Sequence, residues 1–369
     1  MLSRGCRPAQ RRHPIVVRRP AVRERPGGST MTPGCWRGPE VVAVDVHVID
    51  EAGVHEHTPD ELPALLAGDA LVWVDVPTWD DEAADVLTRV FGLHPLAVHD
   101  CAVRNRLPKV HGYPDALFLV LHSPEQGAAG HVHHVELDRV IGPRYLVTVH
   151  GPTNEAVPLE VTLQDTREVL ERIRAGRLRP RTAFDISHAV VSTMTRRMER
   201  FVETLTQEVW NLEQRVTAGT YDDPEKFLDE LFRTRHGLLA VHTIAAQTGE
   251  IYRRVLSLSH PVPDESRHLV ADLVDQFDRI AGLAGQEKEY LQGVIEYYRA
   301  RTDTKMTIAA ERLAVIAVVT LPITALASVL GMNLIVNQHT TGTPLTIALA
   351  VMLGMSGLLL WWAKRQDWW

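Results

Sequence analysis

Cysteine is scarce in this chain, and the motifs of the common enzyme classes are missing. The 369 residues include three cysteines, Cys6, Cys35 and Cys101, too few and too scattered for a disulfide framework or a tetrahedral zinc site. We therefore expect free thiols and a reducing compartment for the soluble part. The sequence has no glycine-rich phosphate loop, nucleophile elbow or zinc-protease motif, so we expect a protein that is not an enzyme. A net charge of −7 disfavours nucleic acid as a partner.

Charge is missing from two long stretches near the C-terminus. Residues 313–330 and 345–363 contain no Asp, Glu, Lys or Arg, and each is long enough to span most of a hydrocarbon core about 30 Å thick. Trp361 and Trp362 lie at the end of the second stretch, as in the aromatic belts of membrane interfaces. The pattern predicts two transmembrane helices, at residues 313–333 and 345–363, in a lipid bilayer.

Basic residues predict how the chain is oriented in the membrane. They flank both spans, whereas the loop at residues 334–344 has no charge. By the positive-inside rule the loop is extracytoplasmic, and both termini, including a basic tail at residues 364–369, are cytoplasmic. The prediction is a multi-pass protein of the cell membrane. The flanking basic residues are Arg301, Lys305 and Arg312 before the first span and Lys364 and Arg365 after the second.

The first 180 residues divide by composition into two parts. Residues 1–40 hold nine arginines and six prolines against two acids, and we expect this basic arm to be disordered. We expect a dispensable tail or a segment upstream of a start at Met31, and the alternative is an arm that contacts anionic lipid or nucleic acid. Residues 41–180 alternate short β-branched runs with helical stretches at 80–91, 95–102 and 160–174. That alternation predicts a cytoplasmic α/β domain with a mixed sheet covered by helices.

The following segment is predicted to be helical. A hairpin is expected within residues 181–260, because Gly219 follows the first helix and an Asp223 N-cap precedes Pro224. A stalk helix is then expected at residues 264–312, continuous with the first span. Its apolar stripe is Leu269, Leu273, Phe277 and Ile280. The fold class is thus an α+β membrane protein: an N-terminal cytoplasmic α/β domain with a mixed sheet, a long helical stalk and two C-terminal transmembrane helices.

Small polar residues recur along the first span. Thr320, Thr324 and Ser328 follow a four-residue step, which suits a helix that faces other copies of itself around a narrow passage. Two spans alone cannot enclose a pore, so a channel would require oligomerisation. The alternative is ordinary small-residue packing, with the hydroxyl groups bonded back to carbonyl oxygens, and spacing alone favours that alternative slightly.

Gly331-Met332-Asn333 ends the first span, and here the sequence resembles the CorA family of divalent metal-ion transporters. The resemblance extends over about residues 70–369. It includes Phe91-Gly92-Leu93-His94-Pro95-Leu96 with Asp100, Arg106-Leu107-Pro108-Lys109-Val110, the run from Gly142 to His150, and Leu321-Pro322-Ile323-Thr324. The resemblance implies a homopentamer that transports Mg2+, in which the stalk helix continues into the pore-lining span.

The resemblance also implies which residues carry the function. Gly331, Met332 and Asn333 would form the selectivity filter, where five amide oxygens can hydrogen-bond to the water shell of a hydrated cation. Regulatory cytoplasmic Mg2+ would bridge Asp100 and Asp272 between subunits, with His99 at the position of a neighbouring acid and Ser192 at that of another. The pore-lining positions would be Thr307, Ala310, Leu313, Ala317, Leu321, Thr324 and Ser328.

The chain departs from the family pattern in its outer loop. Residues 334–344 lack the usual acids and contain His339, which leaves a zinc, cobalt or nickel transporter of the same fold as one alternative. A non-conducting, membrane-tethered metal sensor is another. Histidine pairs at His55/His57 and His131/His133 could also bind a transition metal, although we expect them to be surface residues.

Overall fold

The computed structural model describes residues 44–127, 130–220, 223–258, 262–334 and 342–365. The basic arm and residues 335–341 of the outer loop lie outside the described residues. The strands are β1 (Asp45–Asp50), β2 (Gly53–His57), β3 (Leu71–Val76), β4 (Lys109–Gly112), β5 (Leu117–Gln126), β6 (Val132–Ile141) and β7 (Tyr145–Val149). The α-helices are α1 (Leu62–Ala67), α2 (Asp81–Asp85), α3 (Pro95–Ala102), α4 (Leu159–Arg174), α5 (Ala183–Ala218), α6 (Pro224–Ser257), α7 (Arg267–Leu334) and α8 (Gly342–Arg365).

All seven strands form one mixed sheet in the order β2-β1-β3-β7-β6-β5-β4. The pairing of β3 with β7 is parallel, with Val74 opposite Val147, and the other pairings are antiparallel. The mixed sheet predicted from the sequence is therefore confirmed.

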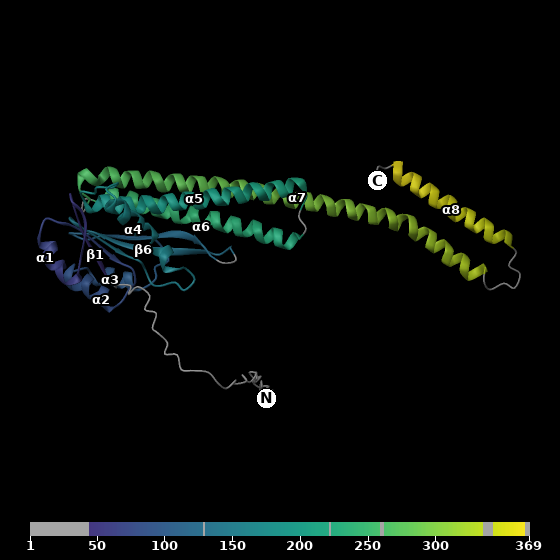
Figure 1. Ribbon diagram of the computed structural model, residues 1–369. Helices are drawn as coiled ribbons and strands as arrows, with labels where there is room; N and C mark the ends of the chain where they lie inside the picture. Colours follow the sequence, from purple (N-terminus) through teal and green to yellow (C-terminus); the bar gives the residue numbers. More distant parts are fainter. Residues whose placement is uncertain (1–43, 128–129, 221–222, 259–261, 335–341, 366–369) are drawn as a thin grey trace, which may run out of the picture. The chain divides into compact units, whose positions relative to one another are not determined.

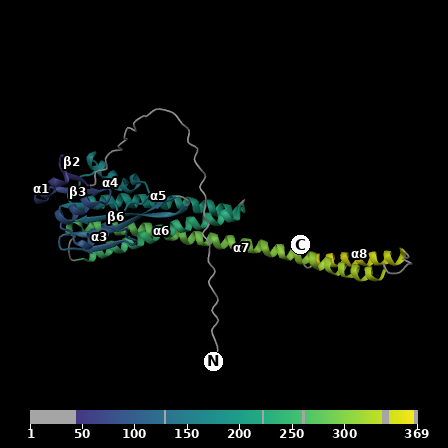
Figure 2. The same cartoon turned by 90° about the horizontal axis from the view of Figure 1, so that it is seen from below.

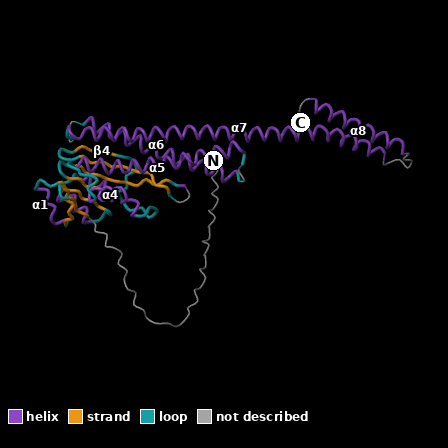
Figure 3. Tube along the Cα trace, turned by 45° about the horizontal axis from the view of Figure 1, so that its top comes forward, coloured by secondary structure: helices purple, strands orange, loops and turns teal. Residues whose placement is uncertain are grey.

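The sheet lies between two layers of helices (Figure 1). Alternate residues of a strand point to opposite faces, so Val72 and Val74 of β3 pack with α1, α2 and α3, whereas Leu71 and Trp73 pack with the long helices. Figure 3 shows the strands beside the long helices. Every residue of β3 is buried, as expected for a strand covered on both faces.

The long helices begin and end at residues suited to those positions. The Thr182 hydroxyl caps α5 by accepting a hydrogen bond from the Asp185 N–H, and Asp223 caps α6 in the same way. Gly219 ends α5 with φ +72°, the left-handed conformation that glycine adopts without strain. At that end the Arg301 guanidinium of α7 donates a hydrogen bond to the Thr217 carbonyl at 2.7 Å. Helix α7 thus supplies a hydrogen-bond donor to a carbonyl group that the last turn of α5 leaves unpaired.

The predicted long helix is confirmed: α7 has 68 residues, about 100 Å at 1.5 Å per residue. The predicted stripe is its packed face, because Leu273, Phe277 and Ile280 are buried and Leu269 is half-buried against the core. Helix α7 is much longer than α5 or α6 and runs past their ends, where α8 contacts it (Figure 2).

Several short elements differ from the expectation. The helix expected at residues 80–91 is a short α2 followed by a π-helical turn at Val86–Val90, which stops before Gly92 at φ +61°. Helix α1 is six residues long and β4 is a four-residue edge strand. Elements this short carry too little hydrophobic periodicity to be seen in the sequence.

Candidate functional site

The C-terminal part of α7 is apolar on all sides and largely uncovered. Leu313 and Leu321 are each 67% exposed and Val329 is 60% exposed. Within the described residues, α7 is the one helix whose length and mean hydropathy, 2.0 over its most apolar window, suffice to cross a membrane. Helix α8 adds a shorter apolar stretch, Leu349–Trp362. So much exposed apolar surface requires a cover of lipid or protein.

Helix α8 covers one face of this part of α7. Val315 is buried, and Val319, Pro322 and Leu326 are half-buried. A step of two residues turns a helix by about 200°, so Leu313 and Ala317 lie on the opposite face. That face is uncovered in the single chain. All seven predicted pore-lining residues are exposed: Thr307, Ala310, Leu313, Ala317, Leu321, Thr324 and Ser328.

The threonine hydroxyl groups of this helix bond back to main-chain carbonyl oxygens. Thr320 Oγ1 donates to Ile316 O and Thr324 Oγ1 to Thr320 O, both at 2.8 Å, and Thr307 Oγ1 donates to Asp303 O at 2.9 Å. This is the bonding expected for ordinary helix packing. It does not exclude an ion pathway along this helix, because each threonine hydroxyl oxygen keeps a lone pair that can accept a hydrogen bond from the water shell of a cation.

Gly331, Met332 and Asn333 lie in the last turn of α7. Their main chain is helical, while their side chains lie outside the described part of the structure. The filter assignment therefore stays a prediction. His339 of the outer loop also lies outside the described residues.

The predicted regulatory residues lie on elements that cover opposite faces of the sheet. His99 and Asp100 belong to α3, and Asp272 belongs to α7. One chain therefore does not bring them together. Lys109 Nζ donates to Asp100 Oδ1 at 2.9 Å. Asp272 Oδ2 accepts from His188 Nε2 at 2.7 Å and from Gln276 Nε2 at 2.6 Å, and the His188 hydrogen bond lowers the pKa of Asp272.

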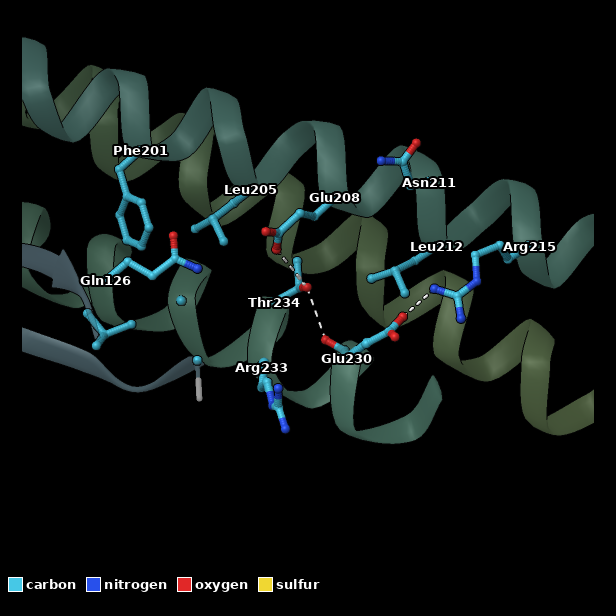
Figure 4. Close-up of a pocket in the computed structure, with 13 residues that line it drawn as sticks. Gln126, Phe201, Leu205, Glu208, Asn211, Leu212, Arg215, Glu230, Arg233 and Thr234 are labelled. Atoms are coloured by element: carbon cyan, nitrogen blue, oxygen red, sulfur yellow. Dashed lines mark hydrogen bonds and ion pairs between the residues drawn. The ribbon is translucent and has the colours of Figure 1, made fainter. Parts of the chain in front are cut away.

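No group of three or more His, Cys, Asp or Glu side chains among the described residues is arranged to hold a metal ion. The first histidine pair is engaged locally instead, because His55 lies 3.3 Å from Asp50 and His57 lies 2.6 Å from Glu61. A cleft of about 350 Å³ between α5 and α6 has an Arg215–Glu230 ion pair and a Thr234–Glu208 hydrogen bond in its walls (Figure 4). Both acids there already have partners.

Sequence reasoning missed a buried polar cluster beneath α3. Its members are Cys101, Asn105, His122, Glu136 and Asp138, each less than a tenth exposed. Glu136, Asp138 and Arg139 are charged residues within the buried second half of strand β6. Charged residues in a buried strand are rare without partners, and this signal could have identified the cluster.

An apolar, uncovered helix end on an α/β domain is the architecture of a membrane protein with a water-soluble domain. The chain belongs to the family of the CorA-like Mg2+ transporter protein, whose model matches residues 68–365. It is 25% identical to the cobalt/magnesium transport protein CorA of Thermotoga maritima over 312 residues, 79% of this chain and 83% of that protein. The predicted family resemblance is confirmed, and the family is one of transporters rather than enzymes.

Solved structures share the fold. The CorA magnesium transporter from Methanocaldococcus jannaschii matches with a TM-score of 0.72 at 15% identity, over 89% of this chain and 99% of that chain. The full-length CmaX protein matches with a TM-score of 0.67 at 17% identity, over 88% and 97%. These matches include both the sheet domain and the long helix.

Proposed function

We propose that this protein is a gated, channel-like transporter that moves hydrated divalent cations, in the first place Mg2+, across the cell membrane into the cytoplasm. Membership of the CorA-like family supports the proposal. The relative from Thermotoga maritima is named a cobalt/magnesium transport protein, which supports Co2+ as a second transported ion. Both spans, α7 and α8, would cross the bilayer with the two termini in the cytoplasm.

The observation that carries the proposal is the uncovered face of α7. Helix α8 packs on the Val315 side and leaves the Ala317 side exposed. In a homopentamer, five such faces would surround a central passage. Leu313 and Leu321 would form apolar constrictions that close by dewetting, and Thr324 and Ser328 would face hydrated ions between them and the filter.

Selectivity in this proposal rests on Asn333. Five neutral amide oxygens at the outer mouth would hydrogen-bond to the water shell of the ion without removing it, which suits an ion that dehydrates reluctantly. Gly331 and Met332 would shape the turn that presents the ring.

Closure in this proposal depends on cytoplasmic Mg2+. Asp100 of one subunit would face Asp272 of its neighbour, with His99 beside them. The carboxylates repel until a divalent cation lies between them, so low cytoplasmic Mg2+ would loosen the closed assembly. The placement of these residues on opposite sides of one chain is compatible with a site formed between two chains.

Two experiments test the proposal in liposomes that contain the purified full chain. Entry of Mg2+, Co2+ and Zn2+ is followed with trapped indicators, beside Asn333→Ala. We expect Mg2+ entry in the native protein and its loss in the variant; undiminished entry in Asn333→Ala would remove the filter assignment. Entry of Zn2+ without Mg2+ would identify a zinc transporter, and no entry of any ion would favour a sensor.

The second experiment compares the two faces of α7. Ala317→Cys is expected to lose Mg2+ entry after treatment with a cationic thiol reagent, because the added charge lies in the ion passage. Val319→Cys is the matched control, since α8 covers that side. Equal block of both variants, or block of the Val319 variant alone, would contradict the assignment of the faces.

A further inference from the structure

Asn105 ties the end of α3 to the sheet through its main chain and its side-chain amide nitrogen. It is 8% exposed and lies between α3 and β4. Its main-chain N–H donates to Glu136 Oε2 at 2.8 Å. Its side-chain Nδ2 contacts Glu136 Oε1 at 2.5 Å, Asp100 O at 2.8 Å and Val103 O at 3.1 Å. One buried side chain therefore joins the main chain of Asp100 to strand β6.

His122 of β5 holds the main-chain carbonyl of Asn105. Its Nε2 lies 2.9 Å from Asn105 O. Burial lowers the pKa of His122 to about 4, against the opposing effect of that hydrogen bond, so the imidazole is neutral at physiological pH. Because a carbonyl oxygen can only accept, the single ring proton must lie on Nε2. The loop is thus held from both β5 and β6.

Two buried acids of β6, Glu136 and Asp138, adjoin this hydrogen-bonded loop. Asp138 lies two residues from Glu136 on the same face of β6, and it is fully buried. Burial and the charge of Glu136 raise the pKa of Asp138 well above its usual range. Burial raises the pKa of Glu136 as well, against the opposing effect of the hydrogen bonds from Asn105, and negative charge on Glu136 would strengthen both bonds from Asn105.

We infer that Asn105 is a positioning residue for Asp100, and that it sets how well Asp100 takes part in the regulatory site. This inference rests on the proposed role of Asp100 in binding cytoplasmic Mg2+. Helix α3 has eight residues, so few hydrogen bonds of its own hold its last turn. Lys109 holds the Asp100 carboxylate from one side, and Asn105 holds the main chain beneath it. Loss of the Asn105 amide would free the turn, and the Asp100 carboxylate would have to be ordered again when Mg2+ binds.

The test is Asn105→Ala in the full chain, purified in detergent and digested with trypsin over a series of MgCl2 concentrations. We expect the Mg2+ concentration that gives half-maximal protection to rise about five- to tenfold, because two or three hydrogen bonds that pre-order the site are lost. Thr248→Val is the matched control: it removes a buried hydrogen bond to Ile244 O in α6, remote from Asp100. It should lower the thermal midpoint without moving the Mg2+ dependence.

The double variant distinguishes positioning from general destabilisation. In the Asp100→Asn background, Asn105→Ala should cause no further shift, because the two residues act through one site. If Asn105→Ala does not fold, Glu136→Gln takes its place, because it removes the charge of the acceptor in the Asn105–Glu136 hydrogen bonds. It should raise the half-maximal Mg2+ concentration in the same way. If the half-maximal Mg2+ concentration changes in Asp100→Asn but not in Asn105→Ala, the inference about Asn105 is overturned and the proposed role of Asp100 stands. No shift in Asp100→Asn would overturn the proposed regulatory role and the inference together.

Discussion

Removal of the His188 imidazole is expected to increase the sensitivity of the protein to cytoplasmic Mg2+. His188 Nε2 and Gln276 Nε2 both point at Asp272 Oδ2, at 2.7 and 2.6 Å. A cation that binds this oxygen must displace a donor. A hydrogen bond of this kind is worth about 0.5–1.5 kcal/mol, and the Asp272 side chain is 53% exposed, so solvent reduces its value. We expect the half-maximal Mg2+ concentration in His188→Ala to fall about two- to fivefold.

The measurement is Mg2+-dependent protection of the full chain from trypsin, combined with inhibition of Mg2+ entry in liposomes. His268→Ala is the matched control, because His268 is an exposed histidine one turn before Asp272 on α7. It should leave the Mg2+ dependence unchanged. A rise in the half-maximal concentration in His188→Ala would refute the reasoning, since it would show that His188 orients Asp272 for the metal instead of competing with it.

Two further predictions concern the cytoplasmic domain. Burial raises the pKa of Asp75, but the His150 imidazole and hydrogen bonds from His150, Thr148 and Thr166 outweigh it, so that the pKa is lowered overall. The carboxylate therefore stabilises the fold above pH about 4 and loses this effect as the pH falls through its folded-state pKa. Asp75→Asn should lower the thermal midpoint at pH 7, and the difference from the native protein should shrink in acid; a constant difference would contradict this. Arg197 donates to Asp165 at 2.7 Å and to Glu125 at 2.9 Å, so Arg197→Leu leaves a buried carboxylate unpaired and should cost about 3–5 kcal/mol. A decrease in the thermal midpoint of less than about 2 °C would contradict this prediction, because a loss of that size should lower the midpoint further.

Features that depend on neighbouring residues were predictable from the sequence. Gly219 and Asp223 mark the end of one helix and the start of the next, because both effects act within one helical turn. The long apolar stretch of α7 and the stripe through Phe277 are likewise local, since both follow from residue order and helical periodicity. The family resemblance rests on short motifs for the same reason.

Contacts between distant residues were not predictable. Asn105 meets Glu136, 31 residues away, and His122, 17 residues away. Nothing in the loop sequence indicates that its asparagine is buried. Arg301 reaches the end of α5, 84 residues earlier in the chain, although in the sequence it reads as one basic residue before a membrane span.

The sequence by itself determined the class of the protein, because an uncharged segment of sufficient length, a mixed sheet pattern and the Gly331-Met332-Asn333 motif are each written in consecutive residues. Only the tertiary structure decided which face of α7 is covered by α8 and which side chains hold Asp100 and Asp272. The physical reason is that periodicity defines the faces of a helix, whereas the packing of remote elements determines which face is buried.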